Sequence, residues 1–174
     1  MTDLKIKALE PAVYVGTYGK YNNGSIDGKW LALSNYENAD AFYKACRELH
    51  SDDPDPEFMF QDNENMPCEF GESGDIAEVY KLLEIIKDLD LDADVIRAGI
   101  ALNIPLESIE DAYYGKYSSD IEFAESCADG FSVFPATDWP FRHIDWEEAA
   151  RNLMFDFQED NDHYFSHNYR EQTQ

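Results

Sequence analysis

The chain has 174 residues, of which 37 are acidic and 13 are basic, so its formal net charge is −24. This charge argues against direct binding to nucleic acid or to an anionic membrane surface, since both are themselves negative. With 44% apolar and 14% aromatic residues the chain can still build a core, which argues against global disorder.

Cysteine usage and hydropathy predict a cytoplasmic protein. Cys46, Cys68 and Cys127 are odd in number and lack the spacing of paired metal ligands. No apolar run approaches the ~20 residues that a membrane-spanning helix needs, and residues 1–10 lack the apolar centre of a signal peptide.

Residues 1–70 are predicted to form a three-stranded antiparallel sheet with one helix. β-branched and aromatic runs indicate the strands, and an Asn-Gly pair indicates a hairpin turn. The expected elements are a strand at Ala12–Tyr18, a turn within Gly19–Ser25, a strand at Ile26–Leu33, a helix at Ala41–Leu49 and a strand at Glu57–Gln61.

Residues 71–112 are predicted to form a small helical unit, reached through a polar linker at residues 62–74. Asp75 and Glu78 resemble a capping box that opens the first helix. Its apolar stripe consists of Ile76, Val79, Tyr80, Leu83 and Ile86. Asp92 is expected to cap a second helix that runs to Leu102, and Pro105 to be the first residue of a third.

Residues 113–174 are predicted to form a mixed unit of helices and strands. The expected elements are a strand at Tyr113–Tyr117, a helix opened by Ser119 and Glu122 and ended by Gly130, a strand at Phe131–Phe134, a helix opened by Asp145 and Glu148, a turn at Asp160–Asp162 and a strand at His163–Ser166. The fold class is therefore α+β, in three small units.

Negative charge is spread over all three predicted units, with a net of −7, −8 and −9 in chain order. An acidic tail is thereby excluded, and an extended negative surface is predicted. Duplex DNA carries about one charge per 1.7 Å, so the net charge of the whole chain equals that of roughly 40 Å of double helix. The candidate phosphate-like carboxylates are Glu78, Glu84, Asp88, Asp90, Asp92, Asp94, Glu107, Glu110, Asp111, Asp120, Glu122 and Glu125.

No motif predicts a catalytic residue, a metal or a cofactor. An EF-hand that starts at Asp88 would need Gly at its sixth position and Glu at its twelfth, where Ala93 and Gly99 stand. His143, His163 and His167 are candidate zinc ligands together with a carboxylate, but His163 and His167 are four residues apart in a predicted strand, which places them on one face and well separated. The tyrosines at positions 18, 21, 113, 114 and 117 either fill cores, which is commoner, or form a contact surface.

Three blocks of sequence resemble the ArdA antirestriction family, and they are spaced along nearly the whole chain. The blocks are VYVGTYGKYNNGSIDGKWLAL (Val13–Leu33), ACRELHSDDPDPEFMFQD (Ala45–Asp62), and IDWEEAARNLMFDF (Ile144–Phe157) with HYF (His163–Phe165). The first block is the most specific, and the acidic region Asp156–Tyr169 departs from the family pattern.

The resemblance implies a protein of mobile DNA that acts in a bacterial host as a mimic of B-form DNA. It implies binding in the DNA groove of type I restriction–modification enzymes, on their methyltransferase core, without turnover. It also implies an elongated, curved monomer that dimerises through its C-terminal unit.

Three alternatives stay open from the residues alone. The chain is an acidic adaptor for another basic DNA-binding protein, a carboxylate- or metal-dependent hydrolase, or a protein whose surface is acidic for solubility in high salt.

Overall fold

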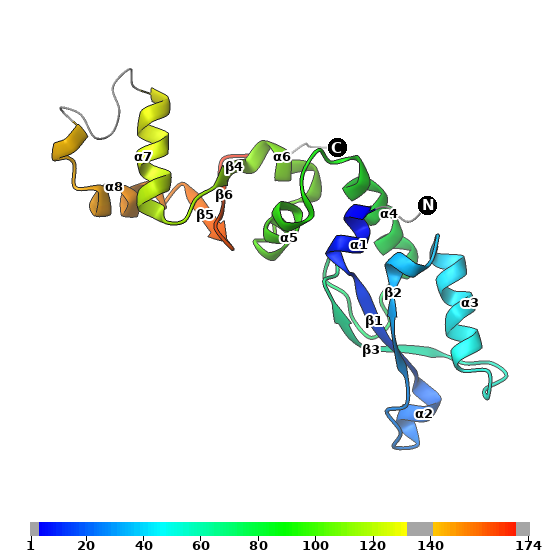
Figure 1. Ribbon diagram of the computed structural model, residues 1–174. Helices are drawn as coiled ribbons and strands as arrows, with labels where there is room; N and C mark the ends of the chain where they lie inside the picture. Colours follow the sequence, from blue (N-terminus) through cyan, green and yellow to red (C-terminus); the bar gives the residue numbers. More distant parts are fainter. Residues whose placement is uncertain (1–3, 132–140, 170–174) are drawn as a thin grey trace. The chain divides into compact units, whose positions relative to one another are not determined.

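The computed structural model describes residues 4–131 and 141–169, and it confirms the predicted α+β class. The chain divides into two compact units, Met1–Arg97 and Ala98–Gln174, and each contains a three-stranded antiparallel sheet (Figure 1). The sequence predicted three units, with borders at residues 70 and 112, and that division stays a prediction. No helix among the described residues is long and apolar enough to cross a membrane.

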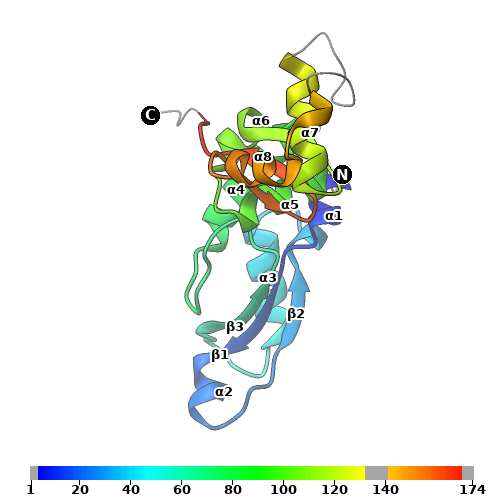
Figure 2. The same ribbon diagram turned by 90° about the vertical axis from the view of Figure 1, so that its left-hand side faces the viewer.

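The sheet of the first unit has the predicted three strands, in the order β2-β1-β3 (Figure 2). Its central strand is β1 (Ala12–Thr17), which pairs with β2 (Lys29–Ala32) and β3 (Phe58–Glu64). Val13 and Val15 alternate along β1 and are both fully buried, so they mark the core face of the sheet. Helix α3 (Ala39–Leu49) supplies Phe42 and Cys46 to the same core.

The predicted hairpin between the first two strands is confirmed, since β1 and β2 pair antiparallel. Its loop spans residues 18–28 and contains the short helix α2 (Tyr18–Asn22) in place of a two-residue turn. The Oγ1 atom of Thr17 accepts a hydrogen bond from the backbone N of Lys20 at 3.2 Å and caps this helix. A side-chain cap of this kind competes with a two-residue turn for the same backbone groups. Strand β2 consequently begins at Lys29 rather than at Ile26, although β1 and β2 still pair.

Helix α1 (Leu4–Leu9) was not predicted, and it packs against α4 (Ile76–Asp88) through Ile6 and Leu9. The Lys5 ammonium donates to the carbonyl of Leu89, just beyond the C-terminal end of α4, where a positive charge is stabilising.

Helix α4 confirms the predicted apolar stripe, in which Ile76, Val79, Leu83 and Ile86 are buried and Tyr80 is half-buried. Asp75 caps α4, since its Oδ1 accepts from the backbone N of Ala77 at 2.8 Å. Helix α5 (Ala93–Ala101) follows where the second helix was expected. The predicted linker at residues 62–74 is partly wrong, because β3 extends to Glu64.

The sheet of the second unit has the order β4-β6-β5. Its strands are β4 (Tyr113–Lys116), β5 (Phe157–Asp160) and β6 (His163–Ser166), and every residue of the central strand β6 is buried. The expected turn between β5 and β6 is present, with Asn161 and Asp162 at φ of 52° and 68°, as in a type I′ hairpin. Strand β5 itself was not predicted.

Helices of the second unit differ from the prediction in two places. Pro105 has ψ of 137° and precedes the 3-10 turn η2 (Leu106–Ser108), and α6 (Ile109–Ala112) follows; the helix therefore does not begin at Pro105. Gly130 does not end α7 (Asp120–Phe131), which includes Phe131, and the rest of the strand expected at residues 131–134 lies outside the described residues.

The helix that Asp145 was expected to open is confirmed. The 3-10 turn η3 (Phe141–His143) precedes α8 (Trp146–Leu153). As predicted, Asp145 caps α8 by accepting from the backbone N of Glu148 at 3.1 Å. Phe123 of α7 stacks on Tyr164 of β6 with ring centroids 4.5 Å apart, and this contact fixes α7 on its sheet.

Replacement of Gly28 by alanine is expected to destabilise the first unit by about 1–3 kcal/mol through overpacking. A Cβ at Gly28 would lie 2.4 Å from the backbone O of Val15 and 2.8 Å from the Tyr14 ring. Urea unfolding of Gly28→Ala measures the loss. Gly71→Ala is the matched control, because nothing lies within 4 Å of a Cβ there. Equal stability of the two variants would show that the close approach at Gly28 is not a constraint.

Candidate functional site

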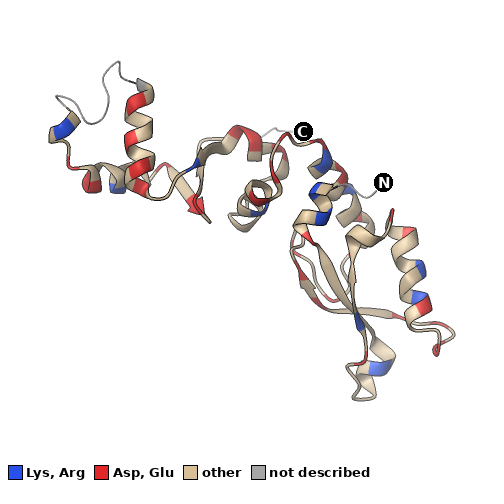
Figure 3. Ribbon diagram, in the orientation of Figure 1, with Lys and Arg blue, Asp and Glu red and all other residues tan. Residues whose placement is uncertain are grey.

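Carboxylates cover the surface of both units (Figure 3). Of the 34 described aspartates and glutamates, 31 are exposed and none is buried; Asp53, Glu125 and Asp160 are half-buried. Residues 1–97 and residues 98–174 each carry a net charge of −12, so neither unit concentrates the charge. The candidate site is therefore a distributed surface and not a pocket.

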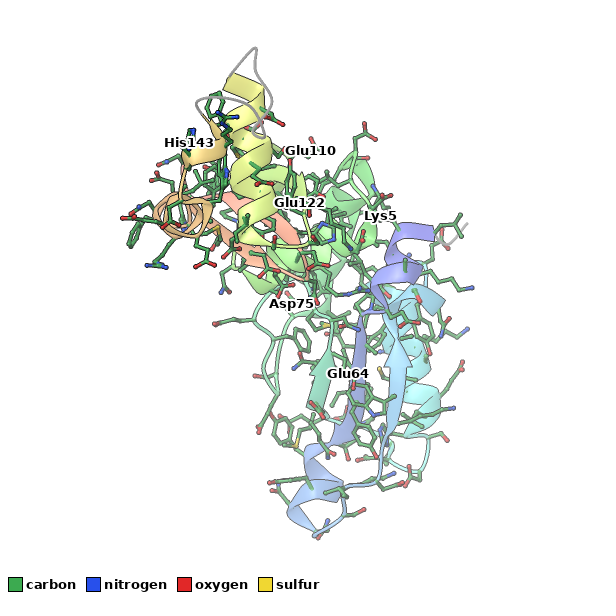
Figure 4. All side chains as sticks on the ribbon, turned by 60° about the vertical axis from the view of Figure 1, so that its left-hand side comes forward. Lys5, Glu64, Asp75, Glu110, Glu122 and His143 are labelled. Carbon is green, nitrogen blue, oxygen red and sulfur yellow. The ribbon has the colours of Figure 1, made fainter. Side chains whose placement is uncertain are left out.

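The structure places eleven of the twelve predicted carboxylates at exposed positions, and Glu125 is half-buried. Glu78 and Glu84 lie on α4, Asp88 ends it, Asp90 and Asp92 follow it, Asp94 lies in the first turn of α5, Glu107 lies in η2, Glu110 and Asp111 lie in α6, and Asp120, Glu122 and Glu125 lie in α7. Figure 4 labels Glu110 and Glu122 of the second unit together with Asp75 and Glu64 of the first.

The segment from Asp88 to Asp94 alternates strictly between exposed aspartate and half-buried apolar residue. Leu89, Leu91 and Ala93 occupy the alternate positions, and Leu89 has an extended backbone with ψ of 135°. The half-buried apolar residues thus anchor the segment while its four carboxylates remain exposed to solvent.

Helix α7 carries a second row of carboxylates, on the side opposite its buried residues Phe123 and Ala124. Glu122, Glu125 and Asp129 follow at i, i+3 and i+7, a spacing that places them on one face. Asp129 was not among the predicted residues, although this spacing is visible in the sequence. Successive acidic bands along α7 are seen in Figure 3.

Two carboxylates of α7 are held by hydrogen bonds. The side chain of Glu122 accepts from the backbone N of Ser118 at 2.8 Å and from its hydroxyl, which lowers the pKa of Glu122 and keeps it ionised. The hydroxyl of Tyr164 donates to Asp120 at 2.7 Å. Burial, and then the hydrogen bond to Asp120, raise the pKa of Tyr164, so this tyrosine stays a donor.

Ion pairs reduce the charge at some of the carboxylates of the first unit. Lys81 pairs with Glu78 and Lys87 with Glu84, each three residues apart on α4. Exposed pairs of this kind contribute about 0–1 kcal/mol and open readily. Glu78 and Glu84 are consequently weaker candidates for contact with a cationic partner than Asp88 and Asp92, which follow them.

Lys20 forms the densest ionic cluster of the first unit. Its ammonium lies 3.1 Å from Asp52, 3.3 Å from Asp27 and 3.2 Å from Nδ1 of the buried His50. The hydrogen bond between Lys20 and Asp52 is the main reason that the pKa of Lys20 is raised and that of Asp52 is lowered. Asp27 and Asp52 are paired with Lys20, and they are therefore weaker candidates for contact with a cationic partner.

Among the described residues, no three His, Cys, Asp or Glu side chains are grouped closely enough to hold a metal ion. His163 is buried in β6 with its Nδ1 3.0 Å from the hydroxyl of Tyr113, whereas His167 is exposed.

Comparison with known proteins assigns the chain to a family. A family model described as "Antirestriction protein (ArdA)" matches residues 13–167. The chain belongs to the ArdA family of antirestriction proteins. No curated protein matches the sequence. The matched range includes all twelve predicted carboxylates and both sheets, except Ala12 at the start of β1.

The charged surface is expected to make stability depend on salt. Raising NaCl from about 10 to 150 mM shortens the Debye length from roughly 30 to 8 Å and weakens repulsion between exposed carboxylates. We expect the melting temperature to rise by a few degrees, about 2–4 °C for each kcal/mol of relief. Scanning calorimetry in a low-salt series measures this effect.

The same series separates a recognition surface from an adaptation to high salt. An ArdA chain with a full apolar core should already melt cooperatively at about 10 mM salt. A chain that folds only in molar salt would instead support the solubility alternative. A melting temperature that does not change with salt would contradict the proposed repulsion between exposed carboxylates.

Proposed function

We propose that this ArdA protein mimics B-form DNA and competes with DNA for the groove of type I restriction–modification enzymes. Family membership supports an antirestriction role. The single observation that carries the finer proposal is the exposure of 31 described carboxylates over both units, without concentration in a tail or a cleft. A surface of this kind fits a partner that presents many cations along an extended path.

The proposed mechanism is occupation without chemistry. The DNA-binding groove of a restriction–modification enzyme presents Lys and Arg side chains that neutralise phosphates and displace their counterions. Exposed carboxylates on a folded scaffold satisfy the same cations, and the rigidity of the scaffold limits the entropy lost on binding. DNA is then excluded from the enzyme as long as the mimic is bound.

A homodimer in the bacterial cytoplasm is part of the same proposal, with residues 113–174 as the dimer interface. Its net charge of −48 would match roughly 80 Å of duplex at DNA's own linear density. The methyltransferase core is the proposed contact, since it carries the groove that reads the DNA site.

Direct binding between the chain and a purified type I methyltransferase core is expected to weaken with salt. Between 50 and 200 mM NaCl the dissociation constant should rise at least about tenfold, because counterions return to both charged surfaces. Calorimetry without DNA measures this, so that the salt dependence of DNA binding does not enter. A dissociation constant that stays flat over this range would eliminate the electrostatic mechanism.

At one fixed salt concentration, the chain should also displace a labelled duplex that contains the recognition site. Binding to the core without displacement of the duplex would point to an adaptor for a basic protein, and would contradict the mimic.

Charge removal is expected to act in proportion to the number of carboxylates removed. Each exposed charge contributes about 0.2–1 kcal/mol, so Asp88→Asn alone should weaken binding to the methyltransferase core less than about fivefold. Replacement of Asp88, Asp90, Asp92 and Asp94 together by asparagine should weaken it about tenfold or more. Asparagine keeps a capping oxygen at positions 92 and 94, so helix α5 should be retained.

The matched control replaces the same four aspartates by glutamate, which keeps the charge and should keep most of the affinity. Abolition of activity by one substitution, with the fold intact by circular dichroism, would instead indicate a catalytic carboxylate and contradict the proposed mechanism.

A further inference from the structure

The first unit contains an aromatic pocket that the distributed acidic surface does not account for. It is an open cavity of about 540 Å³, and its walls include Tyr14, Tyr21, Ile26 and Trp30. Three of these side chains are unusually exposed for large apolar residues: Tyr21 is 51%, Ile26 72% and Trp30 38% exposed, whereas Tyr14 is half-buried. Aromatic rings left open to solvent in a chain of −24 charge indicate a contact surface.

Strand pairing fixes the geometry of this pocket. Tyr14 on β1 is the Cα partner of Trp30 on β2 and of Asp62 on β3, so the three residues form one row across the sheet. Tyr14 alternates with the buried Val13 and Val15 and so lies on the opposite face of the sheet from the core. The rings of Tyr14 and Trp30 are 5.7 Å apart and inclined at 75°, and they make two walls that meet nearly at a right angle.

Backbone contacts hold both ends of the pocket in place. The hydroxyl of Tyr14 donates to the carbonyl of Ile26 at 3.2 Å, which ties the loop before β2 to the ring. The carbonyl of Glu72 accepts from the backbone N of Phe60 at 2.8 Å, which brings Glu72 to the outer edge of β3. Asp62 and Glu72 thus line the pocket, and both residues are exposed. The Oδ1 atom of Asp62 accepts a hydrogen bond from the backbone N of Asn63 at 2.8 Å.

We propose that this pocket binds the guanidinium group of an arginine side chain from the protein that ArdA inhibits. The faces of Trp and Tyr rings attract a cation within about 6 Å of the ring centre. Trp attracts a cation more strongly than Tyr or Phe does. Asp62 and Glu72 add two negative charges to the aromatic lining of this site. A guanidinium is flat and weakly hydrated, so it stacks on a ring while its N–H groups donate to a carboxylate.

Arginine fits this pocket better than lysine. A lysine ammonium is also attracted by a ring face, but it is a compact, strongly hydrated point charge that cannot stack flat on the ring, so it gains less from this pocket. This inference deepens the proposed function, since it assumes that the arginine belongs to the restriction–modification enzyme. Recognition of the guanidinium itself does not depend on that assumption and can be tested without any enzyme.

The direct test titrates the full chain with N-acetylarginine amide at constant ionic strength and follows the indole N–H resonance of Trp30 by NMR. Loss of one resonance in Trp30→Phe assigns that signal among the three tryptophans. Saturable binding in the millimolar range is expected. N-acetylcitrulline amide has the same shape without the charge, and it should bind about tenfold more weakly or not at all. Nα-acetyllysine amide, which keeps its side-chain ammonium, should bind several-fold more weakly than the arginine probe.

A matched pair of double variants separates the pocket from general attraction to an acidic protein. Asp62→Asn with Glu72→Gln removes two charges at the rim, and it should weaken binding of the arginine probe about tenfold. Asp55→Asn with Glu57→Gln removes two exposed charges elsewhere in the same unit, and it should leave that binding within about twofold. Thermal melts confirm that both variants are folded.

The possible failures are distinguishable. If the arginine probe does not shift Trp30, or citrulline or lysine binds as well, the guanidinium pocket is overturned even where the chain still displaces DNA from the methyltransferase core. If the probe binds but the chain does not displace DNA, the proposed function fails and the pocket remains. If both double variants lose equal affinity for the methyltransferase core, the assignment of the arginine to that enzyme is wrong.

Discussion

Repulsion among carboxylates is the constraint on which the rest of this structure depends. Twenty-four net negative charges oppose compaction, because each like pair gains Coulomb energy as the chain contracts. The fold leaves none of its described carboxylates buried, so water screens them. Large side chains such as Val13 and Val15 in one unit, and Phe123 and Phe165 in the other, fill the interior. Charge and core are separated residue by residue, as the alternation from Asp88 to Asp94 shows most simply.

Several of the acids that cause this repulsion also stabilise the helices. Asp75 caps α4 and Asp145 caps α8, and each satisfies a backbone N–H that the helix leaves open. Glu122 in the first turn of α7 is held by Ser118 and faces the positive end of the helix dipole. Carboxylates at helix starts therefore offset part of the cost of the surface that they create.

Local signals in the sequence predicted the elements whose formation is local. The apolar stripe and Asp75 predicted α4, and composition alone predicted that the twelve carboxylates would lie outside the core. The hairpin loop around Gly19–Ser25 is longer than a two-residue turn because the cap at Thr17 favours a helical turn. Strand β5, with the sequence FQED, has no β-branched residue and depends on pairing with β6. The row of Trp30, Tyr14 and Asp62 was not predictable, since its register includes a shift between Tyr14 and Val15 that only the assembled sheet defines.

The aromatic pocket and the acidic surface would contribute differently to binding. In protein–DNA complexes, contacts to phosphates give affinity, and contacts to bases define which site is read. A field of carboxylates is similarly uniform, so a cationic groove could slide along it with little change in energy. The corner formed by Tyr14 and Trp30 differs from every carboxylate around it, and strand pairing holds it at one fixed place. On the proposed function, an arginine that enters this corner would set the register in which the remaining charges meet their partners.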